Sequence, residues 1–124
     1  MGRHSEIREL ERDIAEREEE YSILEDKEEI IKRLRSELID GAEEPVKNYD
    51  MTVSDEFRGA LETDAEEMQH QIYSEIYLAL ERTSQLLSEM AQAKVRIREH
   101  IEKCRRRIDQ LWEEIEAESR SNVM

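Results

Sequence analysis

The chain has few of the residues that build a compact globular core. Of its 124 residues, 5% are aromatic, and there are 3 glycines, 1 proline and 1 cysteine. A single cysteine forms no intrachain disulfide, and no apolar run is long enough for a signal-peptide core or a membrane span. We therefore expect a cytoplasmic protein that, if it is exported, leaves the cell without a classical signal peptide.

Charged residues make up 42% of the chain and apolar residues 37%. This balance, with apolar residues at regular intervals, is typical of long helices and coiled coils and not of disordered chains. Acidic residues outnumber basic ones by 33 to 19, and the formal net charge of -14 opposes binding to nucleic acid or to an anionic membrane. The segment 94–107, KVRIREHIEKCRRR, has seven basic residues against two acidic ones. We interpret it as a solvated helix face, and a docking site for an acidic partner is the alternative.

The first half of the sequence predicts one amphipathic helix. One set of apolar residues has spacings of three, four or seven, which is helical periodicity: Ile7, Leu10, Ile14, Tyr21, Leu24, Ile31, Leu34 and Leu38. We expect this helix to run from about residue 5 to 40 and to end at Gly41 as a C-cap. Arg17 and Glu28 occupy positions where this periodicity predicts apolar residues, so we expect weak packing in the middle of the helix.

A connector follows at residues 41–56. It contains Pro45, which opposes continuation of the helix. We expect the chain to bend near residues 57–59, where an aromatic residue, Phe57, and a glycine, Gly59, occur together.

The rest of the sequence predicts a second, longer helix from about residue 60 to 118, with its weakest point at residues 81–85. No glycine or proline occurs after residue 59. The apolar stripe advances by about 3.6 residues per step, the period of a straight α-helix. It consists of Leu61, Ala65, Met68, Ile72, Ile76, Ala79, Thr83, Leu86, Met90, Ala93, Ile97, Ile101, Cys104, Ile108, Leu111 and Ile115.

These elements predict an all-α fold: an elongated, antiparallel two-helix hairpin that forms a single domain over residues 1–124. If the first helix folds back directly from the bend, it covers roughly residues 60–95. The end of the second helix then has no intrachain partner, and uncovered apolar stripes mark interfaces. We therefore predict that a protein partner or a second copy of the chain binds a face made of Ile97, Ile101, Ile108, Leu111, Trp112 and Ile115.

The sequence gives little sign of catalysis or of a cofactor. Glu67 and His70 have the E-x-x-H spacing of di-iron helical bundles, but a second copy is missing. His100 and Cys104, four residues apart, would share a helix face as half of a metal site. Because the sequence offers no second pair of either kind to complete a metal site, we expect no metal, no cofactor and no enzymatic activity.

The order of these features resembles the WXG-type helical hairpins of type VII secretion, in which Trp-x-Gly stands at the bend between two helices. Here Phe57-Arg58-Gly59 stands in its place. The chain is similar, more closely, to the LXG-associated α-helical proteins of Gram-positive bacteria. That resemblance implies a chaperone or targeting factor that binds the helical N-terminal region of an LXG toxin. It also implies a Tyr-x-x-x-Asp/Glu export signal, for which Tyr77 with Glu81 is the candidate, and Tyr21 with Glu25 is a second match.

Two other functions remain open. The chain could be a structural coiled-coil protein that assembles with itself through the same stripe. A prefoldin-like chaperone would need a hairpin of β-strands between the helices, for which residues 49–53, YDMTV, are the candidate.

Overall fold

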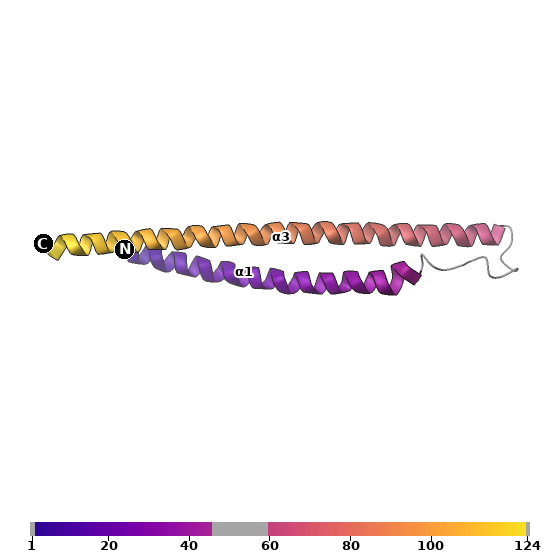
Figure 1. Cartoon of the computed structure of the whole chain (residues 1–124), viewed down its shortest axis with the longest axis horizontal. Helices are drawn as coiled ribbons and strands as arrows, with labels where there is room; N and C mark the ends of the chain where they lie inside the picture. Colours follow the sequence, from indigo (N-terminus) through magenta and orange to yellow (C-terminus); the bar gives the residue numbers. More distant parts are fainter. Residues whose placement is uncertain (1, 46–59, 124) are drawn as a thin grey trace. The chain divides into compact units, whose positions relative to one another are not determined.

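The computed structural model describes residues 2–45 and 60–123, and its regular elements are all helical. Helix α1 spans Arg3–Leu38, the π-helical turn η1 spans Ile39–Glu43, and helix α3 spans Ala60–Val123 (Figure 1). The predicted all-α helical hairpin is confirmed. The bend residues Phe57 and Gly59 and the strand-like run at 49–53 lie outside the described residues.

The end of the first helix differs from the prediction. Gly41 lies inside η1 and is not a C-cap, and the backbone is still helical at Pro45. In η1 the Glu44 N–H donates to the carbonyl of Ile39, five residues earlier. In a regular α-helix the Pro45 ring would collide with the carbonyl of Gly41, four residues earlier, and a wider turn relieves such crowding.

Helix α3 is longer than predicted and continuous. It comprises 64 residues and is unbroken at residues 81–85, the predicted weak point. There the Thr83 hydroxyl donates to the carbonyl of Ala79 at 2.8 Å, which is how threonine is commonly accommodated inside a helix. Within the described residues, neither helix has an apolar stretch long enough to cross a bilayer.

The chain divides into two compact units. Unit 1 consists of Met1–Lys27 and Met90–Met124, and unit 2 of Glu28–Glu89. Within unit 1 the helices are antiparallel: Arg3 pairs with Glu114 at 2.8 Å, whereas Glu25 pairs with Lys94 at 3.8 Å. The single domain predicted for residues 1–124 stays a prediction.

The buried positions follow the heptad spacing of a coiled coil, in which core residues are alternately three and four apart. Each of these positions is buried or half-buried. In α1 they are Ile7, Leu10, Ile14, Arg17, Tyr21, Leu24, Glu28, Ile31, Arg35 and Leu38. In α3 they are Gln69, Tyr73, Ile76, Leu80, Thr83, Leu87, Met90, Lys94, Ile97, Ile101, Cys104, Ile108, Leu111 and Ile115. The polar exceptions predicted in α1 are core positions, and Glu28 exposes only 7% of its surface.

The predicted stripe of the second helix is therefore wrong at several positions of its first half. Met68, Ile72 and Leu86, which the 3.6-residue period assigned to the core, are exposed. The core instead uses Tyr73 and Leu80, each one residue after a stripe position. A straight helix drifts by about 20° per heptad from a 3.5-residue repeat, so the two patterns coincide near the end of α3 and separate toward its start.

Candidate functional site

The predicted partner face at the end of α3 is covered by α1. Ile101 and Leu111 expose 7% and 1% of their surface, and Ile97, Ile108 and Ile115 are half-buried. The prediction that this stripe lacks an intrachain partner is wrong. Trp112 is the exception among the six: it is 46% exposed, and its ring packs edge-on against that of His4, with the ring centroids 5.7 Å apart.

Charge explains why the first half of α1 lies against this part of α3. Residues 94–107 were interpreted as a solvated basic face, but several of their cations pair with acids of α1. Arg105 lies 3.1 Å from Glu18, and Arg107 lies 3.0 Å from Glu6. Exposed pairs contribute little individually, yet together they favour this register over the direct fold-back that we predicted. Acids of α1 are thus partners of several cations in the basic segment.

Simple geometry shows which residues of α1 and α3 lie on the same side of the helix pair. Two antiparallel helices are related by an approximate two-fold axis perpendicular to both, so residues at equal offsets from the core positions lie on one side. Asp13 and His100 each precede a core residue by one, and they meet at 2.7 Å. Glu6 and Arg107 have the same offset and also meet. We call this the shared side.

In unit 2 the shared side carries several exposed apolar residues. Leu34 of α1 and Ile72, Ala79 and Leu86 of α3 have the same offset, and all four are exposed. Met68, one turn before Ile72, is 62% exposed. We call these five residues the unit 2 apolar surface.

Acidic residues border this surface. Residues 60–89 contain seven Asp and Glu, and Arg82 is their one Lys or Arg. Glu75, Arg82 and Glu89 lie seven, fourteen and twenty-one residues after Met68, which places two acids and one base on the same face of α3 in a helix with a heptad repeat. The field over this surface is therefore negative.

The predicted export signal lies in unit 2 as well. Tyr77 is half exposed, and a hydrogen bond with Glu81 raises the pKa of its phenol. Both residues line an open groove of about 610 Å³ between α1 and α3, together with Arg35 and Ile39. The role of Tyr77 and Glu81 in export stays a prediction.

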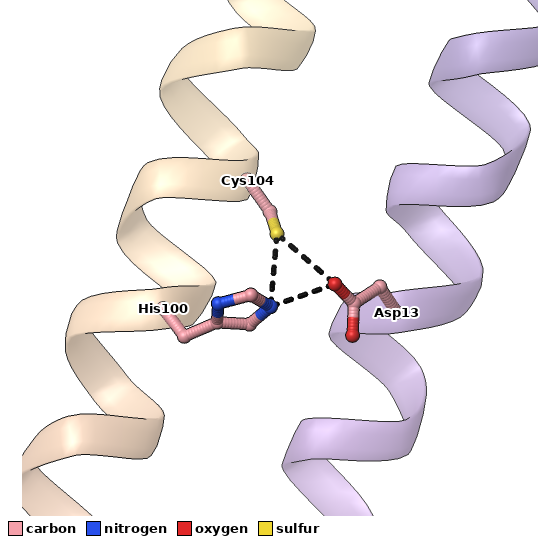
Figure 2. A group of neighbouring side chains, drawn as sticks. All are labelled: Asp13, His100 and Cys104. Carbon is pink, nitrogen blue, oxygen red and sulfur yellow. Dashed lines mark hydrogen bonds and ion pairs between the residues drawn. The ribbon is translucent and has the colours of Figure 1, made fainter.

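A second cluster of functional groups lies in unit 1. Asp13 of α1 meets His100 and Cys104 of α3, with the three side chains pointing toward one another (Figure 2). The His100 Nε2 lies 2.7 Å from Asp13 Oδ2, and the Cys104 Sγ lies 3.6 Å from the same oxygen and 3.7 Å from Nε2. Cys104 is a buried core residue, whereas Asp13 and His100 lie on the shared side.

The electrostatics of this cluster follow from its contacts. Hydrogen bonds from His100 and then from Arg17 hold the pKa of Asp13 below its usual value. Arg17 donates to Asp13 Oδ1 at 3.1 Å, which leaves Oδ2 for the other two side chains. Burial and the neighbouring Asp13 carboxylate raise the pKa of the Cys104 thiol. Without a cation the cluster is thus an ionised carboxylate beside a protonated thiol.

The sequence identified the His100 and Cys104 half of this cluster but missed Asp13. The signal that could have found Asp13 is its position in the heptad. Once the core positions are assigned, Asp13 and His100 each lie one residue before a core residue. Glu67 and His70, the other candidate pair, are exposed on α3.

Comparisons of the chain with protein-family models, with curated proteins and with solved structures find no match.

Proposed function

We propose that this protein is a non-enzymatic helical binding protein whose client helix packs on the unit 2 apolar surface. The observation that carries the proposal is the distribution of apolar side chains between the units. Among the residues whose burial the structure describes, five of the six buried core hydrophobics belong to unit 1, whereas seven of the ten exposed large hydrophobics belong to unit 2. Clusters of exposed apolar residues mark binding surfaces.

The core of unit 2 supports the same proposal. Three of its core positions are occupied by Glu28, Arg35 and Gln69, and the Nε atom of Arg35 has no hydrogen-bond partner among the described residues. Meanwhile Leu34, Ile72 and Leu86, which could have filled such positions, lie outside. A third helix on the shared side would remove these side chains from water, at about 25 cal/mol per Å² of apolar surface buried.

The charge of unit 2 indicates the chemistry of the client. Residues 28–89 contain sixteen acidic and six basic side chains, a formal charge of -10. A second copy of the chain would bring the same negative charge to the interface. An amphipathic helix with an apolar stripe flanked by Lys and Arg would be attracted.

We further propose that the client is the helical N-terminal region of an LXG-type toxin, which the protein would hold as a chaperone or targeting factor for type VII secretion. This step rests on the resemblance in layout: an amphipathic helix, a proline-containing connector, Phe-Arg-Gly and a longer amphipathic helix. The helical hairpin and its one-sided apolar surface agree with that layout. The alternative is a structural coiled coil that assembles with itself.

The experiment is size exclusion with light scattering on the protein alone and co-expressed with an LXG-type N-terminal region. We expect a discrete complex with the client, and we expect Ile72→Asp with Leu86→Asp to abolish it. The matched control, His70→Asp with Ser84→Asp, adds the same two charges at exposed positions of unit 2 that lie off the shared side. It should leave the complex intact.

Two results would contradict the proposal. Equal loss of the complex in both double mutants would remove the unit 2 apolar surface as the binding site. A homodimer, at twice the 14.8 kDa chain mass, that dissociates in the Ile72→Asp, Leu86→Asp variant and ignores the client would establish self-assembly instead.

A further inference from the structure

The Asp13, His100 and Cys104 cluster brings three different metal-binding groups together from two helices. His100 and Cys104 are one helical turn apart on α3, and Asp13 faces them from α1 within unit 1 (Figure 2). All three candidate ligand atoms lie within 4.8 Å of one another. The protein's binding surface in unit 2 makes no use of them.

The distances fit a tetrahedral cation. Ligand atoms at about 2.0–2.3 Å from a zinc ion lie about 3.3–3.7 Å apart. The two separations that involve sulfur, 3.6 and 3.7 Å, already have these values. The third, 2.7 Å between Nε2 and Oδ2, is a hydrogen bond. Replacing its proton with a metal ion requires these two atoms to separate by about 0.6 Å, which the half-exposed His100 side chain can accommodate by a small rotation.

The surroundings also suit a metal site. Arg17 donates to Asp13 Oδ1 and so orients the carboxylate with Oδ2 toward His100 and Cys104, as outer partners do for metal ligands. The Cys104 sulfur is held at a buried core position, whereas the His100 side chain is 46% exposed. The cluster is therefore reachable from the solvent along its imidazole.

We propose that Asp13 Oδ2, His100 Nε2 and Cys104 Sγ bind one zinc-class divalent cation, with water as the fourth ligand. A thiolate with an imidazole and a carboxylate selects zinc, or cobalt as its substitute, over magnesium or calcium, which prefer oxygen ligands. On binding, the Cys104 thiol releases its proton to solvent, and the His100 ring binds through Nε2 as the neutral tautomer that carries its proton on Nδ1. The ion then ties α1 to α3 in unit 1 and makes the stability of that unit dependent on metal.

The test uses the full chain after removal of metal with a chelator. Titration with Co²⁺ should give a thiolate-to-cobalt charge-transfer band and visible bands of tetrahedral intensity at one ion per chain. Zn²⁺ should displace the cobalt and raise the Tm, since a ligand that binds the folded state stabilises it. Mg²⁺ should do neither.

Variants decide whether these three side chains are the ligands. Cys104→Ser, Asp13→Asn and His100→Gln should each weaken binding by more than about tenfold, the least that losing even an outer partner costs a metal site. The control His70→Gln removes an exposed histidine of unit 2 and should bind as the parent chain does.

Circular dichroism on each variant checks that α1 and α3 are still helical. Because Cys104 is buried, the Asp13 and His100 variants, which change residues on the shared side, decide the outcome if Cys104→Ser unfolds. Binding without a thiolate band, or binding that His70→Gln weakens as much as His100→Gln does, would overturn the proposal and leave the cluster a hydrogen-bonded ion pair.

Discussion

Truncation of Leu111 tests whether α1 covers the end of α3. Leu111 is the most completely buried large side chain described, with 1% of its surface exposed. Leu→Ala changes at buried sites cost about 2–5 kcal/mol, depending on how far the cavity collapses. Because two helices can move together more easily than a full core, we expect the lower end, about 2–3 kcal/mol.

This cost is readily measured by thermal unfolding. An unfolding entropy of about 2.1 cal/mol/K per residue gives about 0.26 kcal/mol/K for a chain of 124 residues. Leu111→Ala should therefore lower the Tm by about 8–12 °C in circular dichroism. The control is Val95→Ala, at a half-exposed position of the same helix and unit. It should change stability by less than about 0.5 kcal/mol.

A concentration series separates the two ways in which Leu111 could be buried. If α1 of the same chain covers it, the Tm is independent of protein concentration; if a second copy covers it, the Tm rises with concentration. A shift for Leu111→Ala no larger than that for Val95→Ala would refute the register described above.

Three further predictions concern charged and polar groups. Replacing the buried Glu28 with Leu should raise the free energy of unfolding by about 1–2 kcal/mol in urea titrations, because an apolar side chain at a core position avoids the cost of burying a charge; a loss of stability would show that the bonds of Glu28 are needed. Reversing either charge of the Glu6–Arg107 pair should cost up to about 1 kcal/mol, and the double reversal should recover most of it; no recovery would count against their contact. Tyr77 has its pKa raised by Glu81, so this bond stabilises the fold at neutral pH and is lost as the pH rises through the folded-state pKa. Glu81→Gln should move the Tyr77 NMR titration to lower pH, and an unchanged curve would exclude the bond.

The helical content was predictable from the sequence, and the register was not. Apolar spacing and the scarcity of glycine and proline predicted two long helices. The register depended on cross-helix pairs such as Glu6 with Arg107, whose partners are far apart in the sequence. It also depended on the small difference between 3.5 and 3.6 residues per turn, which accumulates toward the start of α3 and turned Ile72 from an expected core residue into a surface residue.

The dependence on register also explains why only part of the Asp13, His100 and Cys104 cluster was predicted from the sequence. His100 and Cys104 are four residues apart, so local periodicity was enough to pair them. Asp13 joins them only through the packing of α1 on α3. Polar core residues caused a different error. Because Arg35 is charged, the apolar periodicity of α1 assigned its neighbour Leu34 to the core, whereas Arg35 occupies the core position and Leu34 is exposed.

The two units share one heptad pattern but differ in their cores and in their charged surfaces. In unit 1 apolar residues fill most of the core, and acids of α1 pair with bases of α3. Each helix therefore buries apolar residues of the other and neutralises some of its charges. In unit 2 the acids have few bases to meet and several apolar residues lie outside the core. A client that supplies both an apolar stripe and positive charge would correct both deficits at once, whereas a second copy would correct only the first. Since the Asp13 cluster belongs to unit 1, metal should change the stability of the helix pair there without altering the side chains that a client contacts, and client binding measured with and without Zn²⁺ should give the same Kd.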